Sequence, residues 1–194
     1  KLAGQHKGGY TGFEVEITDF VDRENENLLT VQLDTREDPS VPPFGFVIDY
    51  LTYGGLYREV WLEVTAESRF TDLFVYTPTL KTARVHWAAE HLEHVAAVRV
   101  RLETEDGTLL AEQTADAAES GRMQLSVPDA QPWDTRHPVL HRCTAELLNA
   151  AGQIVDRKQT TFGFRTAEFK ADGFYLNGKK TFLRGLNRHQ SYPY

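Results

Sequence analysis

The stretch HRCTAELLNAAGQIVDRKQTTFGF, residues 141–164, consists of two strand-forming runs on either side of the turn sequence NAAGQ. This arrangement predicts a β-hairpin. The stretch VAAVRVRLETEDGTLLAEQT, residues 95–114, repeats it around Asp106 and Gly107. About seven short strands are expected in this way between residues 68 and 166, with no convincing helix. The pattern predicts an immunoglobulin-like β-sandwich over residues 68–166, with Trp87 and Trp133 in its core.

The N-terminal third also alternates apolar and polar residues. FEVEIT (residues 13–18), LLTVQL (28–33) and GGLYREVWLEV (54–64) show the period-two pattern of half-buried strands. These strands are too few to close a sandwich. We therefore interpret residues 1–65 as part of one.

The C-terminal segment predicts a further hairpin. In DGFYLNGKKTFLRGLN, residues 172–187, two runs meet at Asn177 and Gly178, a pair suited to the positive φ angles of a type I′ turn. The second run, residues 181–183, is too short to form a sheet alone. This hairpin must therefore lead into a further domain or pack on the sandwich before it.

Composition restricts the partners of the chain. Of 194 residues, 41% are hydrophobic, and 21 Lys and Arg are scattered among 28 Asp and Glu, for a net charge of −7. The charge distribution argues against nucleic acid or an anionic membrane as a partner and favours an uncharged ligand.

The single Cys143 excludes an intrachain disulfide. The start KLAGQHKGGY has no apolar core, so we read it as a cut end rather than a signal peptide and expect a cytoplasmic protein.

The order and spacing of several segments resemble glycoside hydrolase family 2, the β-galactosidase-like enzymes. The resemblance covers nearly the whole chain and rests on these segments: HKGGYTGFEVEITDFV, NLLTVQLDT, YGGLYREVWLEV, PW followed by HPVLH, and FGFRT followed by GFYLNGKKTFLRGLNRHQSYP. It implies an all-β architecture. Residues 1–65 would be the C-terminal part of a jelly-roll sugar-binding sandwich, residues 66–166 the immunoglobulin-like sandwich, and residues 167–194 a hairpin and the first strand of a (β/α)8 catalytic barrel.

The resemblance also implies the chemistry. A retaining glycosidase uses two carboxylates roughly 5–5.5 Å apart as acid/base and nucleophile. In the family both come from later barrel strands, so no catalytic residue is expected in this chain. The pairs Glu14 with Glu16 and Glu59 with Glu63 follow strand spacing. We expect them on a solvated face.

The polar residues after the last strand are the candidate substrate-binding site. In a (β/α)8 barrel, functional residues lie at the C-terminal ends of strands, which places Arg184, Asn187, Arg188 and His189 at a substrate pocket. By resemblance, Arg184 would orient the catalytic carboxylates, and His189 would stabilise the transition state through sugar hydroxyls. Gln190 stands where many family members have Glu. The alternative is a loop in which Arg184 and Arg188 bond backbone carbonyls.

Other candidate residues are weaker. His86, His91 and His94 would have to converge to bind a metal, and we expect them on the surface, with no metal site. Tyr10, Phe44 and Tyr50 could stack on a sugar ring, although aromatic side chains by default anchor a core or a loop.

Two functions stay open. The chain is either a non-catalytic part of a glycosidase acting on β-linked sugars, β-galactosides first, or part of a carbohydrate-binding or structural β-sandwich protein without a barrel. Carbohydrate is the expected partner, and the intact enzyme could form a homo-oligomer. No cofactor is identified, and a divalent or monovalent cation in the intact enzyme is left open.

Overall fold

The computed structural model describes residues 1–9, 11–36, 38, 40–41 and 54–186. Two compact units make up the chain. One comprises Lys1–Leu62 with Leu186–Tyr194, and the other is Glu63–Gly185.

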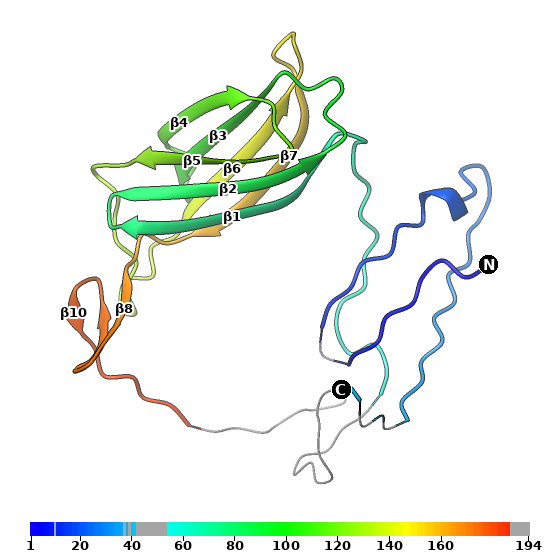
Figure 1. The fold of residues 1–194 in the computed structure, drawn as a ribbon, viewed down its shortest axis with the longest axis horizontal. Helices are drawn as coiled ribbons and strands as arrows, with labels where there is room; N and C mark the ends of the chain where they lie inside the picture. Colours follow the sequence, from blue (N-terminus) through cyan, green and yellow to red (C-terminus); the bar gives the residue numbers. More distant parts are fainter. Residues whose placement is uncertain (10, 37, 39, 42–53, 187–194) are drawn as a thin grey trace. The chain divides into compact units, whose positions relative to one another are not determined.

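The larger unit contains a seven-stranded β-sandwich (Figure 1). Its strands form two antiparallel sheets, with the orders β1-β2-β5 and β4-β3-β6-β7. The strands are β1 (Arg69–Thr79), β2 (Thr82–Glu90), β3 (Ala97–Thr104), β4 (Leu109–Asp116), β5 (Ser120–Ser126), β6 (His141–Leu148) and β7 (Ile154–Phe162). The sequence-based prediction of a β-sandwich in this part of the chain is confirmed.

Alternate residues of the facing strands fill the space between the two sheets. Val98, Val100 and Leu102 of β3 are fully buried, and their neighbours in sequence point to the outer face. This is the burial pattern that a period of two produces. Trp87 of β2 is only 5% exposed, as predicted. Its indole covers Gly121 of β5, where an added Cβ would lie 2.1 Å from the ring. Only glycine fits at this position.

Glycines with positive φ angles close the two predicted hairpins of the larger sheet. Gly107 (φ 91°) joins β3 to β4, and Gly152 (φ 75°) joins β6 to β7. Glycine enters this backbone region without a steric penalty. Both predicted hairpins are confirmed.

A small three-stranded sheet follows the sandwich. It has the order β10-β9-β8 and is formed by β8 (Ala167–Lys170), β9 (Gly173–Leu176) and β10 (Lys179–Lys180). Asn177 (φ 51°) and Gly178 (φ 74°) connect β9 to β10, and both positive angles fit the predicted type I′ turn. The strand predicted over residues 181–183 is wrong. Regular strand structure ends at Lys180, although the Thr181 backbone N–H still donates to the Phe174 carbonyl of β9 at 2.8 Å, and Phe182 is 83% exposed.

The smaller unit contains no strand among its described residues. The predictions of strands over residues 13–18 and 28–33 are therefore wrong, as is the one over the described residues 54–64, which reach into the larger unit. The regular element found is a short 3₁₀ helix, η1 (Thr18–Phe20). A strand needs backbone hydrogen bonds to a neighbouring strand, and alternation of residue type does not supply them. Apolar side chains stay exposed as a result, including Leu28 at 92% and Trp61 at 73%.

Within the described part of the chain, no helix has the length and apolarity that a membrane crossing requires.

Candidate functional site

Arg184 is the one residue of the predicted substrate-binding set that lies within the described structure. It is exposed and belongs to the segment without regular structure that follows β10. Asn187, Arg188 and His189 lie outside the described residues, as do Gln190, Tyr10, Phe44 and Tyr50. The predicted clustering of these side chains is therefore untested.

The segment that leads to Arg184 is anchored to the sandwich through Asn177. The Asn177 side chain accepts a hydrogen bond from the backbone N–H of Thr166 at 3.0 Å and donates one to the carbonyl of Trp133 at 2.9 Å. Its own backbone N–H donates to the carbonyl of Thr166 at 2.8 Å. These three bonds attach the turn between β9 and β10 to Thr166 and Trp133, which lie in the connections after β7 and before β6.

Trp133 lies at the edge of the sandwich and not in the core. The prediction of a core tryptophan is wrong here because the indole is only half-buried, with the Arg165 guanidinium 4.8 Å from its ring. The Trp133 backbone N–H donates to the Phe164 carbonyl at 2.9 Å. A Cβ added to Gly163 would lie 2.6 Å from the Trp133 Cβ. This close approach explains why a glycine precedes Phe164.

The carboxylates considered in the sequence do not form a catalytic pair. Glu14, Glu16, Glu59 and Glu63 are all exposed, and none lies on a strand. Glu16 instead accepts a hydrogen bond from the backbone N–H of Thr18 at 2.9 Å. Their exposure fits the expected solvated position, although the strand assignment behind it was wrong.

Glu146 of β6 is the only carboxylate among the described residues whose side chain is completely buried. One of its oxygens accepts from Arg99 Nε at 2.8 Å and Nη2 at 2.6 Å. The other accepts from Arg101 Nη2 at 3.2 Å and Arg157 Nε at 2.9 Å. Three arginines, two from β3 and one from β7, thus surround one carboxylate of β6. The sequence pattern of alternating strand residues did not single out this site.

The arginines determine the ionisation of Glu146. Burial by itself raises the pKa of this carboxyl, but the hydrogen bond from Arg99 and the charges of Arg101 and Arg99 oppose it. With the additional bond from Arg157, the net effect is a pKa below its usual value. The carboxylate is therefore ionised and inaccessible. It serves the packing of the sheet and not the chemistry of a ligand.

The histidines do not converge. His86 lies on β2, and the exposed His91 and His94 follow in the β2–β3 connection. Within the described ranges, no group of three His, Cys, Asp or Glu side chains is placed to hold a metal ion. The buried Cys143 has a thiol whose pKa is raised to about 12 by burial and by the Glu103 charge, so it stays protonated.

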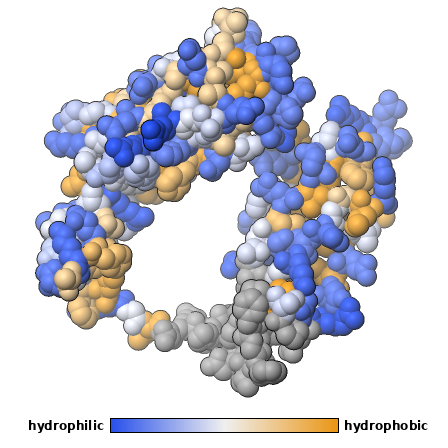
Figure 2. Space-filling model, in the orientation of Figure 1, coloured by the Kyte–Doolittle hydropathy of each residue, from blue (hydrophilic) through white to orange (hydrophobic). Residues whose placement is uncertain are grey.

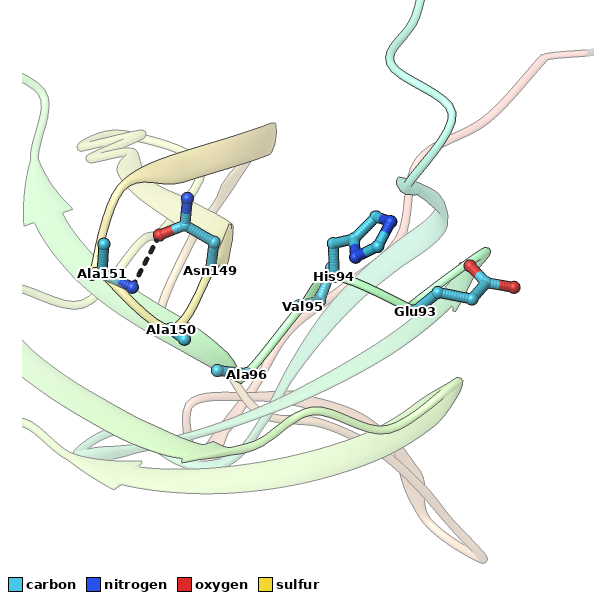
Figure 3. Close-up of a pocket in the computed structure, with 7 residues that line it drawn as sticks. All are labelled: Glu93, His94, Val95, Ala96, Asn149, Ala150 and Ala151. Carbon is cyan, nitrogen blue, oxygen red and sulfur yellow. Dashed lines mark hydrogen bonds between the residues drawn. The ribbon is translucent and has the colours of Figure 1, made fainter.

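A hollow of about 480 Å³ lies between the β2–β3 and β6–β7 connections (Figure 3). One wall carries Glu93 and His94, whose side chains point away from Asn149 on the opposite wall. The Asn149 side-chain oxygen already accepts from the N–H groups of Ala151 at 3.0 Å and Gln153 at 2.9 Å. The polar groups are thus either used by the turn or turned outward, and they form no catalytic arrangement.

Known proteins resemble the chain over different lengths. Residues 68–165 match the sequence profile of the glycosyl hydrolases family 2. A β-galactosidase of Thermoanaerobacter pseudethanolicus is 33% identical over 100% of this chain and 27% of its own length. A β-galactosidase of Thermoanaerobacterium thermosulfurigenes is 37% identical over 98% of this chain and 28% of its own length.

Among solved structures, the apo form of Bacteroides uniformis β-glucuronidase 3 superposes with a TM-score of 0.61. It shares 30% identity over 73% of this chain and 18% of its own. The chain thus spans about a quarter of the length of the curated relatives it matches. The profile match over residues 68–165 covers the β-sandwich, and the relatives extend the similarity across both units. The chain belongs to the glycosyl hydrolases family 2.

Proposed function

We propose that this chain is a non-catalytic part of a glycoside hydrolase that cleaves β-linked sugars, with β-galactosides as the preferred class. The observation that carries the proposal is the similarity to two β-galactosidases over 98–100% of the chain, at 33% and 37% identity. The alternative of a carbohydrate-binding or structural β-sandwich protein without a barrel gives no reason for this end-to-end similarity to enzymes.

The reaction would follow the retaining mechanism, with an acid/base and a nucleophilic carboxylate on opposite sides of the glycosidic bond. Both would come from a part of the enzyme outside this chain. Two observations support this division. The chain matches only about a quarter of each relative, and the buried Glu146 is enclosed by arginines and is closed to substrate.

The finer architecture is part of the proposal. Residues 66–166 would be an immunoglobulin-like domain, which the sheet orders β1-β2-β5 and β4-β3-β6-β7 support. In the constant-type immunoglobulin fold the fourth strand joins the first sheet, whereas here β4 pairs with β3. Residues 1–65 would belong to a jelly-roll sugar-binding domain, and residues 167–194 would lead into a (β/α)8 barrel.

Within that barrel, Arg184 would orient the catalytic carboxylates and His189 would bind sugar hydroxyls as charge develops, with Asn187 and Arg188 beside them. The anchoring of Asn177 to Trp133 supports this arrangement, since it fixes the start of the segment that carries Arg184. A preorganised site depends on such support from rigid elements.

Two further properties are proposed for the intact enzyme. Its exposed apolar side chains in this chain, such as Trp61 and Leu28, favour assembly with other domains or subunits, including a homo-oligomer. The absence of any disulfide, with Cys143 buried and protonated, is compatible with a cytoplasmic location.

The test compares this chain with the full-length protein that contains it. Full-length protein should hydrolyse nitrophenyl β-galactoside, and the 194-residue chain should not. Nitrophenyl β-glucuronide is the necessary second substrate, because a putative β-glucuronidase of Formosa agariphila is also 32% identical over 98% of the chain. Faster hydrolysis of the glucuronide would change the proposed sugar, and no hydrolysis of any β-glycoside would refute the proposal.

A further inference from the structure

The outer face of the β1-β2-β5 sheet carries an unusual group of side chains. Along each strand the neighbouring residues are buried or point inward, so alternate side chains project outward. Strand register places them in two adjacent rows across the sheet. We call this group the outer patch: Phe74, Tyr76, Arg84, His86, Arg122 and Gln124.

Arg84 is held in place at the centre of the patch. Its Nε donates to the side-chain oxygen of Gln124 at 2.8 Å, and its Nη1 donates to the Tyr76 hydroxyl at 3.1 Å. The guanidinium carbon also lies 5.9 Å from the Tyr76 ring centroid. A guanidinium fixed in this way has already lost most of its side-chain freedom. It can bind a ligand at a lower entropic cost than a mobile one.

Aromatic rings border this cation. The rings of Phe74 and Tyr76 lie 6.2 Å apart with 27° between their planes, and His86 meets Tyr76 edge-on at 5.6 Å. Phe74 is 57% exposed, which leaves its ring open to solvent. The patch therefore combines an accessible aromatic surface with fixed hydrogen-bond donors.

The patch is hollowed as well as polar. A depression of about 370 Å³ is lined by Tyr76, Arg84, Arg122, Met123 and Gln124. This volume lies within the roughly 300–1,000 Å³ of small-molecule sites. Hydrophilic residues cover much of the sandwich surface that Figure 2 presents.

The charge of the patch opposes that of the chain. The chain carries a net charge of −7, yet the two rows contain two arginines and no carboxylate. The nearest carboxylates on β1 and β2 lie outside the two rows of the patch. Asp72 lies opposite Ala88, and Glu90 pairs with Arg69 at 2.5 Å. The side chain of Arg122 makes no hydrogen bond or ion pair with any described residue.

These features together specify a ligand class. A guanidinium binds a carboxylate through two parallel hydrogen bonds, and an exposed aromatic ring packs against the apolar C–H face of a pyranose. A peptide added as a strand would use the edge of a sheet and not its face. We propose that the outer patch binds a carbohydrate that carries a carboxylate, with the uronate group on Arg122 and Arg84 and the sugar ring on Phe74. The proposal does not depend on the proposed catalytic function.

The experiment measures binding to the 194-residue chain by NMR titration. The probes are an α-1,4-linked galacturonate trisaccharide and a galactose trisaccharide of the same linkage. The galacturonate probe should shift the resonances of Arg122, Arg84 and Phe74. The neutral probe should bind at least about tenfold more weakly, because hydrogen bonds to charged groups contribute about 1.5–3 kcal/mol.

Two variants and one control test the residues. Arg122→Gln should weaken galacturonate binding about tenfold or more through loss of a charge-assisted bond, and Phe74→Ala should weaken both sugars. Arg136→Gln, in the exposed connection between β5 and β6, removes the same charge elsewhere and should leave binding unchanged. Unchanged melting temperatures establish that the variants fold.

Three outcomes would overturn the proposal. The first is equal affinity for the charged and neutral trisaccharides. The second is unaltered galacturonate binding in Arg122→Gln. The third is tighter binding of a hexaglutamate peptide than of the trisaccharide, which would make the outer patch a site for an acidic protein segment.

Discussion

The side-chain amide of Asn177 donates a hydrogen bond to the backbone carbonyl of Trp133 over 2.9 Å, although 44 residues separate the two in sequence. The same side chain accepts from the backbone of Thr166, and the same residue takes the positive φ angle of the turn. One asparagine thus shapes the β9–β10 turn and attaches it to the sandwich. Asparagine suits this position because it tolerates the left-handed region and offers both a donor and an acceptor.

Replacing Asn177 with Ala should therefore loosen the small sheet. The change removes two side-chain hydrogen bonds and places an unsuitable residue at φ 51°. We expect a loss of about 1–3 kcal/mol in the stability of β9 and β10. Hydrogen exchange of the amides in residues 173–181 measures this directly.

Asn177→Gly is the matched control, since glycine adopts positive φ freely but lacks the side chain. It should recover the part of the loss that comes from backbone strain and leave the part that comes from the bonds to Trp133 and Thr166. Exchange rates in Asn177→Ala equal to those of the unmodified chain would show that the attachment has no energetic role.

Glu146 should be the most sensitive charged position of the sandwich. Glu146→Gln keeps the shape of the side chain but leaves Arg99, Arg101 and Arg157 around a neutral amide. Breaking a buried ion pair by removing one partner costs about 3–5 kcal/mol. Urea unfolding should detect this loss. Arg157→Gln removes the most exposed of the three arginines and should cost less.

The lowered pKa of Glu146 also predicts an acid sensitivity. Because its folded-state pKa lies below its ordinary value of 4.5, its contribution is fully present above that pH and is lost as the pH falls through the folded pKa. The unmodified chain should thus lose stability below pH 4.5 more steeply than Glu146→Gln. Parallel pH profiles for the two proteins would contradict the assigned role of the arginines.

His141 should produce a second loss of stability at a higher pH. Its side chain is buried beside Phe164, with ring centroids 4.9 Å apart, and burial lowers the pKa of the imidazole below 6.5. The unfolded chain then binds the proton more readily, so stability is present above pH 6.5 and is lost as the pH falls below it. Melting temperatures measured from pH 7.5 to 5 should show this decline.

In His141→Phe the decline below pH 6.5 should disappear, because phenylalanine packs with Phe162 and Phe164 but does not titrate. His137→Phe is the control, since His137 is exposed in the connection before β6. A decline that persists unchanged in His141→Phe would mean that another group causes it.

The parts of the fold that could be predicted from the sequence are those in which a strand pairs with the strand next to it in the chain. The hairpins around Gly107 and Gly152 and the Asn177–Gly178 turn were predictable because each joins strands that are neighbours in sequence. The strands expected over residues 13–18 and 181–183 were not found. A period-two pattern indicates which side chains of a strand would face the core, but it does not show which other strand would pair with it.

The same limit applies to the side-chain sites. Glu146 and its arginines come from β3, β6 and β7, and the outer patch comes from β1, β2 and β5. Only the register of the strands brings these residues together, and single-strand patterns contain no information on register between distant strands. Trp133 was misplaced for a related reason, because its contact with Gly163 joins two connections and not two strands.

Arg184 allows a catalytic role to be separated from a structural one. It is exposed and forms no bond with any described residue, so Arg184→Ala should change the stability of the 194-residue chain by no more than about 0.5 kcal/mol. In the full-length enzyme, where we propose that it orients the catalytic carboxylates, the same change should lower kcat/KM by about two to three decades. Lys179→Ala removes another exposed cation, on the preceding strand β10, and should leave both quantities unchanged. His189→Ala should match Arg184→Ala in the full-length enzyme if both residues line one substrate pocket. A large loss of stability in the chain, together with an unchanged rate in the enzyme, would instead make Arg184 a structural residue.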